Sequence, residues 1–340
     1  MRHFWKLTIL LLAMLAVPPG AQAARLSNLY TAQIPVVDRT DETLQEALRA
    51  ALAQVLVRVT GQRGIASDPD LVEMLDGADR LVLQRQYTRD GELRVTFDGN
   101  AVEQLAVTAG LPVWGANRPA TLVWLAVDDG AGERRLVAAG EEDEVQLFLA
   151  EVAAERGVPL LWPLMDSQDR EALAFADVWG NFRDRIDAAS ERYSPDAVLI
   201  GRAAVANEGY SVRWNLTISE ISDDWQSSLD DGVHRTADLF ASFLTINDSG
   251  DGARVALIVD GIDSLRSYAL VMRYLEQLTL ISLLEVREVM ASTVTFDLEL
   301  RDHPAKLVRA ISLGAPLRAR GNTVPADVTG NSTLRYVYVE

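Results

Sequence analysis

The spacing of apolar positions predicts a small α+β unit in the first block of the chain, residues 24–112. A strand is expected over 28–37, followed by a long helix with Asp41 as its N-cap and Gly61 at its end. Asp90-Gly91 between two extended runs predicts a two-residue hairpin turn. The apolar stripe that predicts the helix consists of Leu44, Leu48, Leu52, Val55 and Val59.

The second block, residues 120–247, alternates strands and helices. Its first strand is apolar without interruption, as in a strand buried on both faces. In the strand over 210–218, apolar and polar residues alternate strictly, which places Trp214 and the other apolar residues on one face. Phe148 lies on one helical face with Val145, Leu149 and Val152, and the second helix carries Phe182 and Ile186. A sheet of mixed direction follows from this layout. The expected elements are strands over 121–127, 158–161, 197–204 and 210–218, and helices over 141–155, 179–192 and 234–246.

The third block, residues 253–340, has the order strand, helix, strand, strand, helix, strand, which is that of a ferredoxin-like βαββαβ fold. Two segments rich in Pro, Gly, Asn and Asp, 112–119 and 247–252, separate the blocks and are expected to be linkers. We therefore predict an α+β or α/β protein of two or three small mixed-sheet domains, at 24–112, 120–247 and 253–340.

The first 23 residues have the three parts of a secretory signal peptide. Arg2 and Lys6 supply a basic start, residues 7–17 are apolar, and Ala21-Gln22-Ala23 has the spacing of a cleavage site. This apolar run is shorter than the roughly 20 residues needed to cross a bilayer, so cleavage after Ala23 is favoured over an uncleaved anchor. The mature chain is expected in the periplasm, without a transmembrane segment.

The balance of charges and the lack of cysteine exclude several classes of function. Asp and Glu number 49 against 32 Lys and Arg, which gives a net charge of −17. Such a chain disfavours binding to nucleic acid or to an anionic membrane surface. The absence of cysteine rules out disulfides, thiol catalysis and cysteine-based metal sites, so stability is expected to come from packed cores.

Three segments of the second block carry a resemblance to a known family. They are residues 118–127 (RPATLVWLAV), 155–166 (ERGVPLLWPLMD), and the run from 175–180 (FADVWG) to 196–202 (DAVLIGR). Together they resemble an uncharacterised proteobacterial envelope family, domain of unknown function 2066, over a stretch from about Tyr30 to Asn247. The resemblance implies export, and it brings no established activity, ligand or catalytic residue.

A weaker resemblance concerns the fold of the second block. Residues 196–201, followed by an alternating strand that begins at Tyr210, look like the N-terminal domain of the Tol-system protein TolB. Proteins with domains of this type are assembly and scaffold components. The likeness implies a fold for this block and leaves its functional site open.

No catalytic or cofactor signature appears along the chain. His234 and His303 stand at expected helix starts, which indicates capping or surface roles, and neither a G-x-S-x-G nor an H-E-x-x-H motif is present. Residues 247–252 match the first positions of a calcium loop, but Ile258 stands where a bidentate glutamate is required. We therefore predict a non-enzymatic protein with no cofactor and no metal.

Trp162 and Trp179 are the candidate partner-binding residues. They stand beside a proline and a glycine at the ends of expected elements, where they would line a groove for a peptide or a partner strand. Core packing is the alternative for both. Trp124 and Trp214 fall inside apolar strands and are expected in the core.

The leading hypothesis is a periplasmic, non-enzymatic scaffold or accessory factor that acts in envelope assembly or maintenance through contacts with envelope proteins. The first alternative is a module in the second block that binds a small ligand or a glycan. The second is a hydrolase that uses the carboxylate pairs Asp223-Asp224 and Asp230-Asp231, which flank Trp225.

Overall fold

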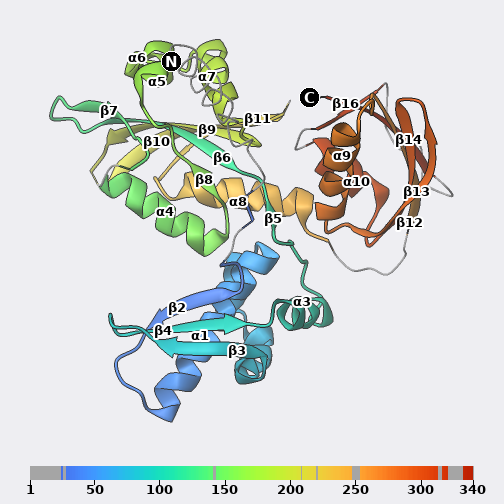
Figure 1. Ribbon diagram of the computed structural model, residues 1–340. Coiled ribbons are helices and arrows are strands. Elements are labelled where there is room, and N and C mark those ends of the chain that lie inside the picture. Colours follow the sequence, from blue (N-terminus) through green and yellow to red (C-terminus); the bar gives the residue numbers. More distant parts are fainter. Residues whose placement is uncertain are drawn as a thin grey trace, which may run out of the picture.

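The computed structural model contains three main sheets, each with its own helices (Figure 1). The predicted signal peptide and the predicted linker 247–252, with its calcium-loop alternative, lie outside the described residues. The mixed α+β class predicted from the sequence is confirmed. The structure describes residues 24–25, 28–140, 143–207, 209–219, 221–246, 253–312, 316–320 and 332–339.

The N-terminal part is a three-stranded antiparallel sheet in the order β2-β4-β3, packed against one long helix. The predicted hairpin joins β3 to β4, but its loop has three residues and not two, because the Thr88 N–H donates to the Glu92 carbonyl and leaves 89–91 between the strands. Gly91 takes a positive φ of 80° at the last position of this loop, where three-residue hairpin loops have a left-handed residue. The elements are β2 (Thr31–Pro35), α1 (Asp41–Thr60), α2 (Val72–Asp76), β3 (Val82–Tyr87), β4 (Glu92–Phe97) and α3 (Gly99–Thr108), with the 3₁₀ turns η1 (Arg63–Ser67), η2 (Pro69–Leu71) and η3 (Ala78–Leu81).

Helix α1 forms much of this core because its apolar stripe faces inward. The predicted stripe is fully buried except for Leu44, which is half-buried. The N-cap is Thr40 and not Asp41, since the Thr40 side chain accepts a hydrogen bond from the Thr43 N–H. Asp41 lies in the first turn, where its charge complements the helix dipole. The helix ends as predicted at Gly61, which takes a left-handed φ of 75°.

The central sheet has the strand order β11-β10-β9-β6-β7, with β8 also paired to β6. Strands β8 and β9 run parallel to β6 and the other pairs are antiparallel, so the predicted mixed direction is confirmed. The elements are β6 (Thr121–Asp128), β7 (Arg134–Leu136), α4 (Glu144–Arg156), β8 (Leu160–Leu161), α5 (Ser167–Ala172), α6 (Phe175–Trp179), α7 (Arg183–Ser190), η4 (Glu191–Tyr193), β9 (Ala197–Val205), β10 (Tyr210–Ile218), β11 (Ile221–Ser227) and α8 (Asp231–Leu244).

Helices cover both faces of the central sheet, which explains why β6 is apolar without interruption. Figure 1 shows α4 and α8 on one side of the sheet and α5, α6 and α7 on the other. Alternate residues of β6 enter the two cores: Val123 and Leu125 pack with residues of α4 and α8, whereas Leu122 and Trp124 pack with residues of α6 and α7.

Two aromatic residues of the predicted apolar helix positions lie at the surface. Phe148 on α4 is 44% exposed, and Phe182, just before α7, is 56% exposed. The helix predicted over 179–192 is divided into the end of α6 and all of α7. The chain turns between them at Asn181, which takes a positive φ of 56°, a conformation that asparagine tolerates better than most residues.

The C-terminal sheet has the order β13-β14-β12-β16-β15. Neighbouring strands are antiparallel except for β12 and β16, which are parallel. Because β16 inserts between β12 and β15, the sheet has one strand more than the predicted βαββαβ order. The elements are β12 (Ala253–Asp260), α9 (Leu265–Gln277), β13 (Ile281–Met290), β14 (Thr293–Leu300), α10 (Pro304–Ser312), β15 (Leu317–Ala319) and β16 (Ser332–Tyr338).

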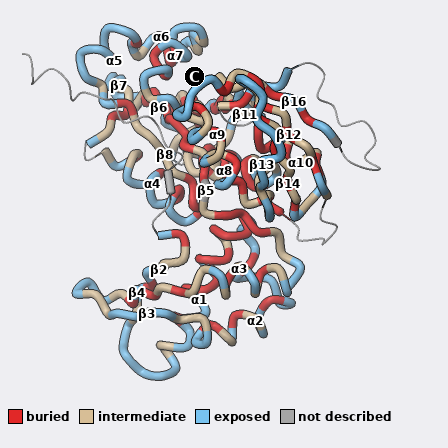
Figure 2. Tube along the Cα trace, turned by 45° about the vertical axis from the view of Figure 1, so that its right-hand side comes forward, coloured by how far each residue is buried: buried red, intermediate tan, exposed pale blue. Residues whose placement is uncertain are grey.

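Buried residues follow the strands and the inner sides of the helices, while the outer helix faces and most loops are exposed (Figure 2). A two-stranded pairing of β1 (Ala24–Arg25) with β5 (Asn117–Arg118) lies where the chain passes from the N-terminal part to the central sheet. In the described part of the chain, no helix has both the length and the apolar character needed to cross a bilayer.

Candidate functional site

The two tryptophans predicted to bind a partner lie in different layers of the central part. Trp162 is half-buried and packs against the core shared with α4 and α8. Trp179 ends α6 in the other helical layer, is 36% exposed, and stacks on Phe175 with the ring centroids 5.3 Å apart. The structure therefore does not bring Trp162 and Trp179 together. Trp124 and Trp214 are fully buried, which confirms their predicted place in the core.

Aromatic side chains gather at the surface around Trp179. The stacked pair Phe175–Trp179 is followed by the exposed Phe182, whose ring lies against Gly180: a Cβ atom on this glycine would come within 2.9 Å of a ring carbon. Tryptophan, other aromatic residues and arginine are enriched in protein interfaces. We call Phe175, Trp179 and Phe182 the aromatic surface.

Buried polar groups hold the helices beneath the aromatic surface. Asp177 of α6 accepts a hydrogen bond from the Ala174 N–H at 2.8 Å and pairs with Arg185 of α7. These two partners lower the pKa of Asp177, so its carboxylate is charged at neutral pH. Trp124 donates from Nε1 to the Ser190 hydroxyl at 2.9 Å, which ties α7 to the sheet. These contacts thus fix the positions of α6 and α7, which carry or adjoin the aromatic surface.

The C-terminal end of α1 contacts the central part, where two arginines bind its carbonyl groups. Arg118 Nη2 donates to the Arg58 carbonyl at 2.7 Å, and Arg156 Nη2 donates to the Gly61 carbonyl at 2.9 Å. The last turn of a helix leaves carbonyls without intrahelical partners and carries a partial negative charge. The two guanidinium groups, both essentially fully buried, therefore cap α1 from the neighbouring part of the protein.

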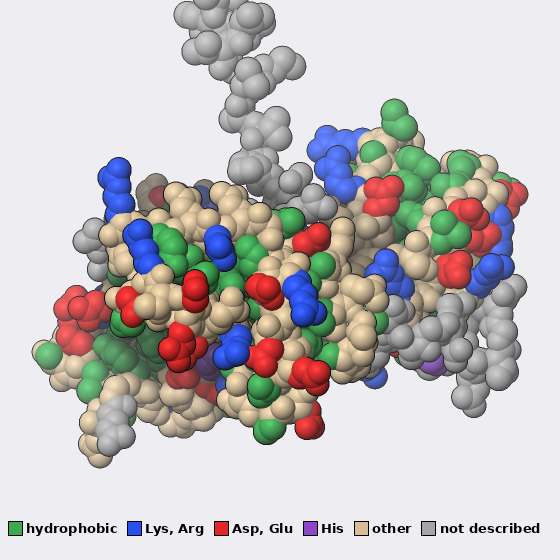
Figure 3. Space-filling model, turned by 90° about the horizontal axis from the view of Figure 1, so that it is seen from below, with side chains coloured by type: hydrophobic (Ala, Val, Ile, Leu, Met, Phe, Trp, Pro, Cys, Tyr) green, Lys and Arg blue, Asp and Glu red, His purple; other side chains and the backbone are tan. Residues whose placement is uncertain are grey.

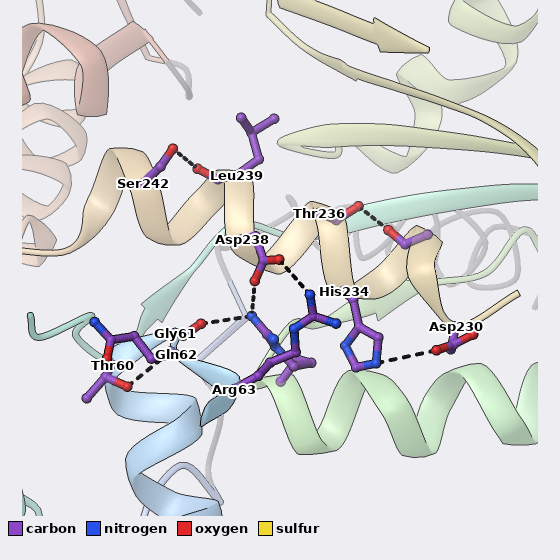
Figure 4. A network of polar contacts seen from close by, with 12 residues as sticks. Thr60, Gly61, Gln62, Arg63, Asp230, His234, Thr236, Asp238, Leu239 and Ser242 are labelled. Carbon is purple, nitrogen blue, oxygen red and sulfur yellow. Dashed lines mark hydrogen bonds and ion pairs between the residues drawn. The ribbon is translucent and has the colours of Figure 1, made fainter. Parts of the chain in front are cut away.

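Asp238 of α8 contacts this cap, and a histidine lies nearby on the same helix (Figure 4). Its carboxylate accepts a hydrogen bond from Arg156 Nη2 at 2.5 Å and pairs with Arg63 at 3.4 Å. His234, one turn earlier on α8, lies with its Nε2 atom 3.6 Å from the Asp230 carboxylate. Burial, reinforced by the charges of Arg63 and Arg156, lowers the pKa of His234 despite the opposing effect of the two aspartates.

The free energy of unfolding should depend on His234 below neutral pH. The pKa of His234 is lower in the folded protein than in the unfolded chain, where the ordinary value is about 6.5. Above that pH the imidazole is neutral in both states and has no effect. As the pH falls through about 6.5, the unfolded chain binds the proton first, so stability decreases.

Urea unfolding of the wild type and of His234→Gln, at several pH values from about 7.5 down to 5, measures this contribution. We expect His234→Gln to lose less stability over this range than the wild type. The matched control is His303→Gln, at an exposed histidine whose Nδ1 accepts a hydrogen bond from the Ala305 N–H at the start of α10. Equal losses in wild type and His234→Gln would contradict the prediction.

A short segment of the predicted linker contacts all three parts of the protein. Val113 exchanges two backbone hydrogen bonds with Ile246, each 2.9 Å long, and the Trp114 N–H donates to a carbonyl of α1 at 2.6 Å. Gly115 lies so close to Thr279, between α9 and β13, that a Cβ atom would come within 2.0 Å of the threonine hydroxyl. This connection is therefore buried and packed, not a solvated tether.

A cation also caps the last helix of the central part. Lys306 of α10 donates from Nζ to the carbonyl of Thr245 at 3.0 Å and to the carboxylate of Asp302 at 2.7 Å. Thr245 is the C-cap residue of α8. Both junctions thus use the same device, in which a cationic side chain from one part binds a C-terminal carbonyl of a helix in the part before it.

Arg118 is buried with only part of its hydrogen-bonding capacity used. Its Nη2 atom donates to the carbonyls of Arg58 and Trp114, while Nε and Nη1 have no acceptor among the described residues. Burial, together with the charges of Arg58 and Arg156, lowers the pKa of Arg118 to about 9, so the group stays protonated at neutral pH. Its guanidinium carbon lies 3.6 Å from the ring centre of Trp114, a cation–π contact that offsets part of the cost of burial.

Sequence reasoning did not identify Trp114, Arg118 or Arg156. The signal available was a tryptophan and an arginine four residues apart in a segment otherwise rich in proline, glycine and asparagine. The acceptors on α1 lie 60 residues from Arg118 and 95 residues from Arg156, and they are backbone carbonyls. No residue type marks such an acceptor, so the contact is invisible in the sequence.

The carboxylates considered for hydrolysis are held by separate partners. Asp223 pairs with Arg235 of α8 at 2.9 Å. Asp224, the next residue of β11, lies opposite Asn215 of β10 and accepts a hydrogen bond from its Nδ2 atom at 2.7 Å. Asp230 faces the histidine of α8. Among the residues that the structure describes, no group of three or more His, Asp or Glu side chains is arranged to hold a metal ion.

Residues 23–115 of the chain are similar to a family described as a domain of unknown function, DUF8605. The matched stretch comprises the N-terminal part and extends to Gly115, at the packed connection described above. No curated protein and no solved structure matches the chain. The comparisons thus support an uncharacterised domain family for the N-terminal part.

Proposed function

We propose that the protein is an exported, periplasmic and non-enzymatic scaffold or accessory factor, which acts in envelope assembly or maintenance through protein–protein contacts. The observation that supports this best is the aromatic surface, where Trp179 is 36% exposed and Phe182 is 56% exposed. Exposed aromatic residues on a fixed base are the type of group on which binding energy concentrates in protein interfaces. The predicted signal peptide supports export.

The capped junctions support a scaffold in particular. Parts of a chain joined by a solvated linker move relative to one another by default. Here Arg118 and Arg156 hold the end of α1, and Lys306 holds the end of α8. A protein built in this way presents its surfaces at a fixed spacing, which is the property that an assembly factor needs.

Two resemblances of the sequence support this proposal. We propose that the region from Tyr30 to Asn247 is related to the proteobacterial family of domain of unknown function 2066, and that the central part is related to the TolB N-terminal domain. The ferredoxin-like type is kept for the C-terminal part, with β16 as an added strand. These resemblances favour an envelope role without naming the partner.

The proposal is tested by affinity capture of the tagged full-length protein after mild crosslinking in the periplasm of its native cells, with mass spectrometry of the recovered proteins. We expect one envelope protein to be recovered in near-stoichiometric amount. Trp179→Ala is expected to lower this recovery about tenfold or more, since truncation of a central interface aromatic costs about 2 kcal/mol.

The matched control is Phe148→Ala, which removes an exposed aromatic ring from α4 in the opposite helical layer. This variant should recover the partner as the wild type does. Recovery of the tagged protein alone would overturn the scaffold proposal. Undiminished recovery with Trp179→Ala would show that the aromatic surface does not bind the partner.

A further inference from the structure

A cleft of about 290 Å³ opens beside the aromatic surface, between β7 and the helices α5 and α6. Arg134, Arg135 and Arg170 contribute its basic lining, and Leu173 and Phe175 are among its apolar residues. Phe175 belongs to both features, since it also stacks on Trp179. The cleft and the aromatic surface therefore form one continuous region of the central part.

The lining of the cleft is basic in a protein that is acidic overall. On the face of the molecule seen from below, acidic and basic side chains are interspersed (Figure 3). The described residues that line the cleft include three arginines and no carboxylate. Arg134 binds Asp128 through Nε at 2.9 Å, and Arg135 binds Asp143 through Nε at 2.8 Å. Each guanidinium has five N–H donors, so these contacts use only part of each donor set.

Arg170 differs from the other two arginines. It lies exposed on α5 and forms no ion pair with any residue that the structure describes. The two arginines of β7 are each paired with a described carboxylate, whereas Arg170 is not, which leaves the described lining of the cleft with an excess of positive charge. An anion that enters it gains a charged donor that no described protein group occupies.

The apolar side of the cleft is the edge of a packed core. Leu173 is buried, and Leu136, Met165 and Phe175 pack half-buried against the same cluster, which contains Trp124. These side chains are fixed by the core and present a small apolar surface next to the arginines. The cleft therefore combines a site for a negative charge with room for an apolar group.

One wall of the cleft is held in a strained backbone conformation. Met165 has a positive φ of 49°, which is unfavourable for a residue with a side chain. Its N–H donates to Asp169 Oδ2 at 2.9 Å, Tyr193 donates its hydroxyl to the same oxygen at 2.5 Å, and Arg192 donates to Oδ1 at 2.8 Å. Asp169 is 1% exposed. A buried network thus fixes this wall, and strained residues of this kind are concentrated at ligand sites.

We propose that this cleft binds the C-terminal carboxylate of a partner protein whose last residue is apolar. The arginines match a carboxylate in charge and in donor geometry, and the apolar side receives the neighbouring side chain. The volume lies near the lower limit of pockets that enclose small ligands, which suits one terminal residue better than a lipid chain. The inference rests on the proposed function, because it specifies the chemistry of the partner at the same region.

Binding is measured by NMR titration of the full chain with four probes: N-acetyl-phenylalanine, its C-terminal amide, acetate and inorganic phosphate. We expect N-acetyl-phenylalanine to shift the backbone amides of residues 134–138 and 165–175, and to bind about tenfold or more tightly than its amide or acetate. Arg170→Gln should weaken this binding about tenfold. The matched control is Arg85→Gln, at an exposed arginine of β3 in the N-terminal part.

Equal binding of N-acetyl-phenylalanine and its amide would overturn the proposal, as would tighter binding of phosphate or an undiminished affinity of Arg170→Gln. The outcome is separable from that of the capture experiment. If the probe fails to bind while Trp179→Ala still abolishes recovery of the partner, the inference is wrong and the proposed function stands. If the probe binds as expected and no partner is recovered, the scaffold proposal is wrong and the cleft remains a carboxylate site.

Discussion

Replacing Trp214 by alanine is expected to lower the free energy of unfolding by about 3–5 kcal/mol, the usual cost of removing a buried large aromatic ring. Trp214 is fully buried in β10, and its Nε1 atom donates to the Ser228 carbonyl at 3.0 Å. The indole fits because Gly201 on β9 and Gly232 on α8 lack side chains. A Cβ atom on either would lie 2.5 Å from a ring carbon. Urea unfolding of the two proteins measures the difference.

The fit around this ring gives a sharper second test. Gly232→Ala forces a methyl group into the ring of Trp214 and should cost about 1–3 kcal/mol in the wild type. In the Trp214→Ala background the same change should be nearly neutral, since the clashing atoms are gone. Gly64→Ala, where a Cβ atom meets nothing within 4 Å, is the matched control. An equal cost of Gly232→Ala in both backgrounds would show that the ring is not held between α8 and the sheet.

The second large effect is expected at the junction of α1 with α8. Gly61 has a φ of 75°, and a Cβ atom there would lie 2.4 Å from the Cβ atom of Ala241. Gly61→Ala therefore combines left-handed strain, about 1–2 kcal/mol, with overpacking, about 1–3 kcal/mol. We expect a total loss of about 2–5 kcal/mol in urea unfolding.

Gly110→Ala isolates the first of these two costs. Gly110 also has a left-handed φ, of 70°, but a Cβ atom there meets nothing within 4 Å. The difference between the two variants therefore reports the close packing of α1 on α8. If Gly61→Ala and Gly110→Ala cost the same, the N-terminal part is not packed tightly against the central part, and the protein is not a rigid scaffold.

The proposed function depends on two features of the structure. The capped junctions fix the arrangement of the parts, and the region around Trp179 and the cleft supplies the surface for a partner. Both features belong to the central part or to its borders. A variant that loosens the junction and one that alters the cleft should therefore have separable effects on stability and on binding.

Local patterns in the sequence determined the elements and much of the core. The stripe of α1, its end at Gly61 and the alternation that buries Trp214 were predicted correctly, because each depends on residues close together in the chain. The hairpin at Asp90-Gly91 was also predicted, but its loop has three residues instead of two. The position of the N-cap was missed by one residue, since threonine and aspartate are both good caps and stand side by side.

Only the tertiary structure decided how the parts meet and where the candidate site lies. Phe148 and Phe182 have the spacing of core residues but are exposed, because amphipathic periodicity does not say how far a neighbouring element extends. The cleft brings Arg134 together with Arg170 from separate elements. The cap on α1 joins Arg118 and Arg156 to backbone carbonyls. Every residue has a backbone carbonyl, so the residue types in the sequence could not predict this contact.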